Sequence, residues 1–313
     1  MTVDQTNKIL HEVGKVIRGK RKVTEKILAA LLAGGHILLD DVPGVGKTTM
    51  AVALSRTLGL RYRRIQFTPD VMPSDIVGFS VYDKETGGFR YVPGVAIDTN
   101  LLLGDEINRT SSKTQSALLE AMEERQTTVD GIVHPLADPF WVIATQNQVG
   151  TAGTQTLPHA QMDRFLVRLT LGYPDYESQM EIIRDRQTSD PLDEVVQIAT
   201  REEILTMMRE VRECAMSDEI VAYITRLAMA SREHTMLELG ISPRGAICLG
   251  RMSRAQAYLS GRDFVIPEDV QAVISDVCAH RVLLSQKARL ERMSSGQVMA
   301  ELLQSVPVPY TGK

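Results

Sequence analysis

Short apolar runs alternate with amphipathic stretches between residues 36 and 172. Runs of about five residues without a polar face are typical of strands in a parallel sheet that helices cover on both sides. The runs predict strands over residues 36–40, 62–66, 101–105, 140–145 and 166–170. We therefore expect an α/β fold, with a helix over residues 3–33 before the first strand.

Two segments interrupt this alternation, and each predicts a β-hairpin. Residues 79–93 contain a Gly-Gly pair between two strand-like runs. Residues 127–136 place Asp130-Gly131 between alternating apolar residues, which is the strongest short-range hairpin signal. Both hairpins would be insertions within the α/β region.

After residue 175 the apolar pattern changes from strand-length runs to helical spacing. Helices are predicted over residues 176–186, 201–212, 217–234, 242–260 and 267–284. The last of them opens with Pro267 and two acids, which suit the first turn of a helix. The composition shifts between residues 174 and 200, so we expect an αβα core over residues 1–190 and an all-α domain over residues 191–313.

Bulk composition describes an ordinary globular protein and narrows the range of partners. The 313 residues are 43% hydrophobic and 24% charged, and the formal net charge is −4. Broad nucleic-acid binding usually needs a basic excess, so a nucleic-acid partner is not expected. One basic run, residues 15–22, is better explained as a solvated helix end than as a nucleic-acid contact.

Cysteine usage and the lack of long apolar segments predict a cytoplasmic protein. Cys214, Cys248 and Cys278 are far apart and form no C-x-x-C pair, so we expect buried, reduced thiols instead of disulfides or zinc ligands. The first residues lack the basic and apolar segments of a signal peptide. No apolar run approaches the ~18 residues of a spanning helix, so no transmembrane segment is expected.

A glycine-rich turn carries the strongest chemical signal. Residues 43–49, Pro-Gly-Val-Gly-Lys-Thr-Thr, follow the first predicted strand and precede a helical pattern. This strand–turn–helix order cradles nucleotide phosphates, because Gly44 and Gly46 let backbone N–H groups surround an anion. Lys47 would reach the β- and γ-phosphates, and the Thr48 hydroxyl would bind Mg²⁺.

One position departs from the strict phosphate-loop pattern. The pattern G-x-x-x-x-G-K-[ST] has glycine at the position that Asp41 occupies in this chain. The alternative interpretation is a glycine-rich turn with a chance Lys-Thr pair. The strand before the turn and the helical pattern after it favour phosphate binding.

Two acids follow the apolar run of residues 101–103. Asp105 would lie beside the phosphate loop and hold the Mg²⁺ water shell, while Glu106 would polarise a water molecule for attack on the γ-phosphate. Paired acids after a strand often cap a following helix instead. A phosphate loop upstream on the same predicted sheet favours the catalytic interpretation.

Two further polar residues fit the same site. Asn147 comes just after a predicted strand and could position the attacking water, although asparagine is also common in turns.

Arg164, near the sheet edge, could not easily reach a nucleotide in its own subunit, but it could act on the nucleotide of a neighbouring subunit as an arginine finger. A surface ion pair with Asp163 is the alternative for this arginine, and such pairs contribute little.

Arg244 opens a predicted helix in the second domain. Ser242 would be the cap of this helix and Pro243 its first residue. Arg244 would then lie in the first turn, where it could point back at the γ-phosphate. The alternative is an ordinary exposed helix arginine.

Taken in order, these motifs resemble the AAA+ ATPases, and specifically the MoxR family. The matching stretches are residues 39–48, 66–70, 73–75, 103–109, 113–125, 144–147, 163–165 and 242–244. The resemblance runs from about residue 10 to residue 285. The 113–125 block and an acid at position 41 are specific to this family within the wider class, so Asp41 supports the resemblance.

The resemblance implies a phosphate-loop core, a helical lid and a role for each candidate residue. The implied nucleotide contacts are Val16 and Ile17 at the adenine, and Gly44, Val45, Gly46, Lys47, Thr48 and Thr49 at the phosphates; the implied catalytic set is Asp105, Glu106, Asn147, Arg164 and Arg244. Thr48 and Asp105 would hold Mg²⁺, and Glu106 would be the base. Asn147 and Arg244 would be the first and second sensors, and Arg164 would act on a neighbouring subunit.

The resemblance also implies ATP hydrolysis that drives chaperone-like remodelling or assembly of partner proteins. An arginine that acts on a neighbour implies a ring of identical subunits, expected to be a hexamer. The expected partner is a separate adaptor with a von Willebrand A domain, and the two hairpins would face the pore or a partner. The alternatives are the motor subunit of a metal chelatase, a nucleic-acid motor, and a nucleotide-gated scaffold that does not hydrolyse ATP.

Overall fold

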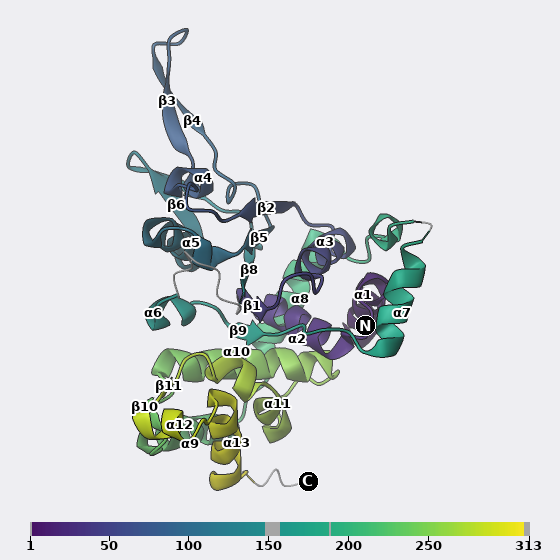
Figure 1. Cartoon of the computed structure of the whole chain (residues 1–313), viewed down its shortest axis with the longest axis vertical. Coiled ribbons are helices and arrows are strands. Elements are labelled where there is room, and N and C mark those ends of the chain that lie inside the picture. Colours follow the sequence, from purple (N-terminus) through teal and green to yellow (C-terminus); the bar gives the residue numbers. More distant parts are fainter. Residues whose placement is uncertain (1, 148–156, 188, 310–313) are drawn as a thin grey trace.

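A five-stranded parallel sheet lies at the centre of the computed structural model, which describes residues 2–147, 157–187 and 189–309 (Figure 1). Its strands are β1 (Ile37–Asp41), β2 (Tyr62–Gln66), β5 (Leu101–Asp105), β8 (Trp141–Asn147) and β9 (Val167–Leu169). Their order across the sheet is β2-β5-β8-β1-β9, and every pairing is parallel. Each strand lies close to a predicted apolar run.

The two faces of the sheet pack into two separate hydrophobic clusters. Successive residues of a strand point to opposite faces, so Leu101 and Leu103 belong to one cluster and Leu102 to the other. The first cluster includes residues of α1 (Thr2–Val16), α2 (Arg21–Leu32) and α3 (Lys47–Thr57), and the second includes residues of α5 (Ser112–Glu124). Burial on both faces explains why the strands appear in the sequence as unbroken apolar runs.

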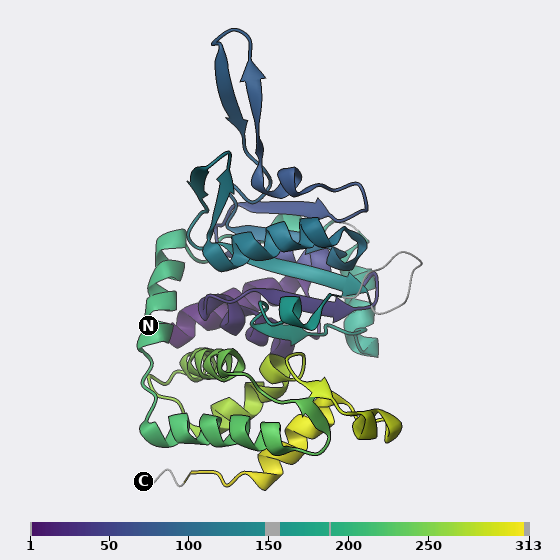
Figure 2. The ribbon, with the colours of Figure 1, turned by 90° about the vertical axis from the view of Figure 1, so that its left-hand side faces the viewer.

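Both predicted hairpins are present. One consists of β3 (Phe79–Asp83) and β4 (Gly88–Val92), which follow the short helix α4 (Pro73–Val77), and the other of β6 (Gln126–Val129) and β7 (Ile132–Pro135). The β3–β4 hairpin projects far from the body of the molecule (Figure 2). The rings of Tyr91 and His134 stack with centroids 3.8 Å apart, so the two hairpins contact each other.

Helices dominate the second half of the chain (Figure 1). They are α7 (Tyr176–Asp185), α8 (Arg201–Glu213), α9 (Asp218–Glu233), α10 (Pro243–Leu259), α11 (Pro267–Cys278), α12 (Gln286–Leu290) and α13 (Ser295–Ser305), while α6 (His159–Met162) precedes β9. The helices from α9 onward pack below the sheet, while α7 lies beside α1 (Figure 1). α10 packs on α2, and α11 packs on β9. Within the described ranges, no helix is long and apolar enough to cross a membrane.

Two secondary-structure predictions are wrong, and both errors come from contacts between distant residues. The single helix expected over residues 3–33 is two helices, because Gly19 adopts a left-handed φ of +67° and packs so closely on Ser178 that a Cβ would lie 2.1 Å from its hydroxyl oxygen. The helix expected over residues 267–284 ends at Cys278, and β11 (Leu283–Leu284) pairs with β10 (Leu237–Leu239). The second half therefore contains a small sheet.

Candidate functional site

The glycine-rich turn encloses open space at the carboxyl end of β1. Gly44 has a φ of +83° and Gly46 a φ of +92°, which residues with side chains rarely adopt. A Cβ on either glycine would meet no atom within 4 Å. Gly46 precedes α3, and no side chain caps the first N–H groups of that helix. The turn therefore presents backbone donors to a concavity that fits a phosphate group.

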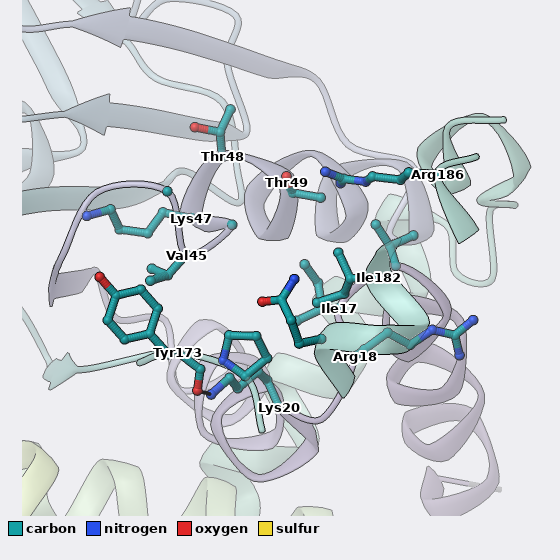
Figure 3. Close-up of a pocket in the computed structure, with 15 residues that line it drawn as sticks. Ile17, Arg18, Lys20, Val45, Lys47, Thr48, Thr49, Tyr173, Ile182 and Arg186 are labelled. Carbon is teal, nitrogen blue, oxygen red and sulfur yellow. Dashed lines mark hydrogen bonds between the residues drawn. The ribbon is translucent and has the colours of Figure 1, made fainter. Parts of the chain in front are cut away.

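A cavity of about 450 Å³ extends from this turn (Figure 3). Its size lies within the range of sites for small molecules and cofactors. Residues 44–49 line one side, and Val16 and Ile17, at and just after the end of α1, line another. The structure thus brings all the expected nucleotide contacts around one cavity.

Sequence reasoning missed part of the cavity wall. The additional lining residues are Arg18, Lys20, Tyr173, Pro174, Gln179, Ile182 and Arg186. Lys20 Nζ donates a hydrogen bond of 2.6 Å to the carbonyl oxygen of Tyr173, which ties the α1–α2 turn to the segment before α7. Arg18 and Lys20 belong to the basic run of residues 15–22, whose pattern predicts a solvated helix end.

Lys47 is buried at the start of α3 and contacts its own loop. Its Nζ donates hydrogen bonds to the carbonyl oxygens of Asp41, at 3.3 Å, and Val42, at 3.2 Å. Burial lowers the pKa of the Lys47 ammonium, while the nearby carboxylates, Asp41 first, oppose that shift. A buried ammonium held among backbone oxygens at the mouth of a phosphate-sized turn is suited to bind an anion.

Asp41 has a structural role that accounts for its presence in place of glycine. Its Oδ2 accepts hydrogen bonds from the backbone N–H groups of Leu171, at 2.5 Å, and Gly172, at 2.8 Å. Its Oδ1 accepts one from Val42 N–H at 2.9 Å. The carboxylate therefore anchors the phosphate loop to the chain that leads into Tyr173 on the cavity wall.

Asp105 and Glu106 lie at the carboxyl end of β5, next to the end of β8. Asp105 Oδ1 accepts a hydrogen bond of 3.1 Å from the Thr145 hydroxyl, which in turn accepts one of 2.9 Å from Glu106 N–H. Asp105 Oδ2 forms an ion pair with Arg64 Nε at 2.7 Å. Thr145 and Arg64 therefore hold the acid pair in place, and neither was expected to do so.

The Glu106 carboxylate is held by two side chains. Gln66 Nε2 donates to Glu106 Oε2 at 3.0 Å, and Arg109 Nη1 donates to the same oxygen at 2.8 Å. The Glu106 backbone has a φ of 56°, which is uncommon for a residue with a side chain and turns the chain sharply after β5. The carboxylate is thus oriented by neighbours and not by helix capping.

The oxygen atoms of Thr48 and Asp105 could bind Mg²⁺ if water and phosphate oxygens supply the remaining ligands. Among the residues that the structure describes, no three His, Cys, Asp or Glu side chains form a metal cluster. Mg²⁺ prefers oxygen ligands and commonly keeps waters and substrate phosphates around one or two protein oxygens. Thr48, on the cavity wall, and Asp105 could supply those oxygens.

Asn147 is the last residue of β8, and its backbone is in register with that of Asp41 on β1. This places its main chain at the same edge of the sheet as the phosphate loop. Its side chain lies outside the described part of the structure. The role expected of the Asn147 amide therefore stays a prediction.

A second cavity, of about 400 Å³, lies at the opposite edge of the sheet. His36 and Leu166, just before β1 and β9, line it, so it faces the amino ends of the strands. The charged residues around it are Glu123, Arg125, Asp163, Arg164, Arg244 and Arg251. We call it the arginine pocket. The arginine pocket lies at the amino ends of the strands, and the phosphate loop lies at their carboxyl ends. The length of the strands therefore separates Arg164 and Arg244 from the phosphate loop of their own chain.

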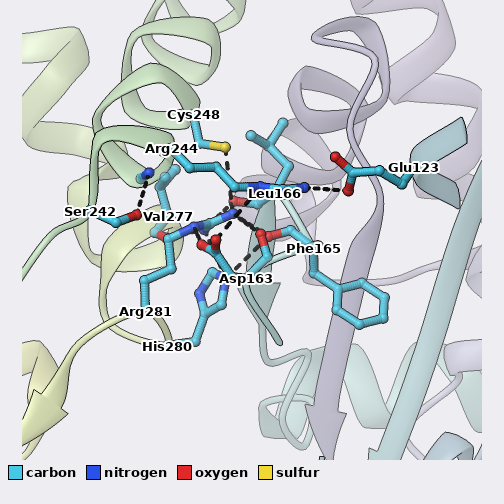
Figure 4. Close-up of polar contacts among 11 residues, drawn as sticks. Glu123, Asp163, Phe165, Leu166, Ser242, Arg244, Cys248, Val277, His280 and Arg281 are labelled. Carbon is cyan, nitrogen blue, oxygen red and sulfur yellow. Dashed lines mark hydrogen bonds and ion pairs between the residues drawn. The ribbon is translucent and has the colours of Figure 1, made fainter. Parts of the chain in front are cut away.

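The position of Arg244 corrects the expectation that it points at the nucleotide of its own subunit. Ser242 does cap α10, accepting a hydrogen bond from Gly245 N–H at 3.0 Å, and Pro243 is the first helical residue. Arg244 Nη2 pairs with Glu123 at the end of α5 at 2.6 Å, and its Nε lies 3.6 Å from Asp163 (Figure 4). The packing of α10 under α2 sets this direction.

Acids balance part of the positive charge in the arginine pocket. The hydrogen bond from Arg244 is the largest cause of a lowered pKa at Glu123, and the charges of Arg244 and Arg164 add to it. Within the described residues Asp163 pairs with Arg244 and Arg281, not with the adjacent Arg164. The arrangement can bind an anion that approaches from outside the subunit.

Comparisons with known sequences assign a protein family to each half of the chain. Residues 36–167 match the family described as ATPase family associated with various cellular activities, and residues 229–302 match the AAA lid domain. The Bacillus subtilis protein YeaC, itself uncharacterized, is 45% identical over 96% of this chain and 94% of its own. Chaperone MoxR1 of Mycobacterium tuberculosis is 37% identical over 98% of this chain and 83% of its own.

A comparison with solved structures agrees. A crystal structure of a proposed ATPase from Cytophaga hutchinsonii superposes with a TM-score of 0.90 and is 36% identical, covering 98% of this chain and 96% of that one. The predicted fold, a parallel-sheet core followed by a helical lid, is confirmed.

Proposed function

The chain belongs to the MoxR family of AAA+ ATPases, and on this premise we propose that it hydrolyses ATP in a homo-oligomeric ring to remodel or assemble partner proteins. We also propose residues 1–190 as the nucleotide-binding core and residues 191–313 as the lid. One relative is named a chaperone, which supports the protein-directed role.

The observation that carries this proposal is the placement of two incomplete sites on opposite edges of one sheet. The phosphate-loop cavity has backbone donors and Lys47 in its lining, but among the described residues neither Arg164 nor Arg244 lines it. Asp105 and Glu106 do not line it either, although their charges act on Lys47. The arginine pocket has four arginines but no phosphate loop. If one subunit's arginine pocket faces the next subunit's cavity, the two halves form a complete site, and the repeated head-to-tail contact closes a ring.

The subunit that binds ATP supplies most of the chemistry. The loop N–H groups and Lys47 hold the phosphates, while Val16, Ile17 and Tyr173 enclose the base. Glu106 takes the proton from the attacking water, and Asn147 orients that water. Thr48 and Asp105 would hold Mg²⁺, which would supply positive charge next to the phosphates.

The neighbouring subunit supplies positive charge at the transferred phosphate. Arg164 stabilises the charge that develops in the transition state, an effect worth roughly 10³–10⁵ in rate for arginine fingers. Arg244 reports nucleotide state to the lid, and both act from the same pocket. This assignment keeps the finger and second-sensor roles but moves Arg244 to the neighbour's nucleotide.

Exposed aromatic side chains on the β3–β4 hairpin support a protein partner. Phe89 is 77% exposed and Tyr82 55% exposed, and their rings lie 5.6 Å apart. Paired exposed aromatics on a projecting hairpin suit contact with a protein surface. A client, or an adaptor with a von Willebrand A domain, would bind there.

Mixing two inactive variants tests the proposal. Lys47→Ala should lose nucleotide binding, and Arg164→Ala should bind nucleotide normally but lose roughly 10³-fold or more in turnover. In a random 1:1 ring, about one interface in four combines an intact Lys47 with an intact neighbouring Arg164. Phosphate release should therefore reappear on mixing.

A matched control is Arg226→Ala, which removes an exposed arginine of α9 and should leave turnover unchanged. Full turnover by Arg164→Ala alone, with no gain on mixing, would contradict the assignment of a site shared between subunits.

A further inference from the structure

Arg281, just after α11 in the lid, is almost completely buried against the chain before β9 (Figure 4). Its side chain is only 1% exposed. The guanidinium Nε donates to Asp163 Oδ1 at 2.8 Å, and Nη2 donates to the carbonyl oxygens of Asp163, at 3.1 Å, and Phe165, at 2.5 Å. Nη1 donates to Leu166 O at 3.1 Å.

Burying a guanidinium is costly unless acceptors replace water at each N–H group. Arg281 meets that need mainly with backbone oxygens of residues 163–166, and Nη1 also contacts Val277 O. Only arginine offers five donors in a planar fork that can reach this many fixed acceptors. The bonds hold the 163–166 backbone in one position relative to the lid.

The held backbone carries Arg164, which lies between two of the bonded carbonyl groups. On the other side, the Phe165 ring is fully buried in the second hydrophobic cluster. With its backbone fixed from both sides, Arg164 has only its side-chain torsions left to adjust. Arg281 contacts the main chain around Arg164 and does not line the phosphate-loop cavity.

We propose that Arg281 is a positioning residue for Arg164. It fixes the position of the Arg164 backbone relative to the neighbouring subunit, and it couples that position to the lid. The Asp163 carboxylate extends the coupling, because Oδ1 pairs with Arg281 while Oδ2 lies 3.6 Å from Arg244 Nε. The Asp163 carboxylate therefore links Arg281 to Arg244, while the hydrogen bonds to the carbonyl oxygens of Asp163 and Phe165 link Arg281 to the backbone on either side of Arg164.

The inference rests on the proposed function, and one mixing experiment separates the two. Arg281→Met should keep the nucleotide dissociation constant, because the phosphate-loop cavity lies at the other edge of the sheet. Its turnover should fall about 10²-fold, since small misplacements of a catalytic group have effects of that size. Mixing with Lys47→Ala subunits, which supply a correctly held Arg164, should restore phosphate release.

Arg262→Met is the matched control. Arg262 is also a lid arginine with a strong pair, donating to Asp269 at 2.7 and 2.6 Å, but it does not touch residues 163–166. Its loss should leave turnover unchanged. Arg281→Lys keeps the charge with three donors in place of five, so it should lose less, about tenfold, and be restored in the same way.

Two outcomes would overturn the inference. One is wild-type turnover by Arg281→Met or, if that variant does not fold, by Arg281→Lys. The other is a loss that Lys47→Ala subunits do not restore, which is the expected result of general damage to the subunit. If Arg164→Ala is restored by mixing in parallel, the proposed function stands in either case.

Discussion

The two pockets of this chain are similar in volume but opposite in construction. The phosphate-loop cavity, of about 450 Å³, is centred on one continuous loop whose donors are backbone N–H groups. The arginine pocket, of about 400 Å³, gathers side chains from the α2–β1 turn, α5, the chain before β9, and α10. The donors of the first pocket are fixed by local backbone geometry, whereas the second presents long side chains that neighbouring residues hold in place.

This difference predicts how each pocket tolerates change. Apart from a change to proline, substitution leaves backbone donors in place, so we expect the phosphate-loop cavity to be sensitive mainly at its glycines and at Lys47. Long arginine side chains lose rotamer freedom when they are ordered, so the arginine pocket depends on partners such as Glu123, Asp163 and Arg281.

The largest effect that would sharpen the comparison is expected at Glu106. Glu106→Gln removes the proposed proton acceptor but keeps the shape of the side chain, so turnover should fall by about 10²–10⁴-fold while nucleotide binding persists. Single-turnover phosphate release and nucleotide titration measure the two quantities separately. Unchanged turnover would show that Glu106 is not the base.

The second effect is expected in the pH dependence of the free energy of unfolding, through a histidine of the arginine pocket. His36, on the wall of the arginine pocket, has its pKa lowered to about 4 by burial, with the charge of Arg125 adding to the shift. Its Nδ1 accepts a hydrogen bond from Val142 N–H at 3.0 Å, and its Nε2 lies 3.1 Å from Met122 O, so the neutral ring already uses both nitrogens. The folded state therefore resists protonation there.

The sign of the stability change follows from that shift. Between pH 6.5 and 4 the unfolded chain binds a proton at His36 that the folded chain does not, so the free energy of unfolding falls as the pH falls. For this one group the loss between pH 7 and pH 5 is about 2 kcal/mol. Denaturant unfolding of His36→Gln should show a pH dependence weaker by about that amount, and an equal dependence would refute the assignment.

The smallest effect is expected at the Glu123–Arg244 pair. Both side chains are about two-fifths exposed, at 39% and 44%, and pairs of this kind contribute at most about 1 kcal/mol. Glu123 competes with phosphate for Arg244, so Glu123→Gln should lower the ATP concentration for half-maximal turnover by up to about fivefold. A higher concentration would show instead that Glu123 positions Arg244.

Much of the fold could be predicted because its signals are local. β2 and β5 lie where their apolar runs predicted, and Asp130-Gly131 marks the turn between β6 and β7. The residues expected at the nucleotide come from one loop and the end of α1, and they line one cavity. These elements depend on burial of a short segment or on a turn, and neighbouring residues decide both.

The rest could not be predicted, because the deciding partner is distant in the chain. Tyr173 reaches the nucleotide cavity through a hydrogen bond from Lys20, and Leu283–Leu284 forms a strand only because Leu237–Leu239 lies beside it. Arg281 resembles any helix-end arginine until residues 163–166 surround it. Contacts between residues so far apart in the chain cannot be predicted from a local sequence pattern.

The sequence by itself determined the chemistry: a phosphate loop, an acid pair after β5 and two candidate arginines, because residue type and local spacing specify them. The tertiary structure alone decided which of these residues share a site. The parallel sheet separates the phosphate loop from Arg164 and Arg244 by the length of its strands, and the packing of α10 turns Arg244 toward Glu123. That geometry distributes the candidate residues between two separate pockets.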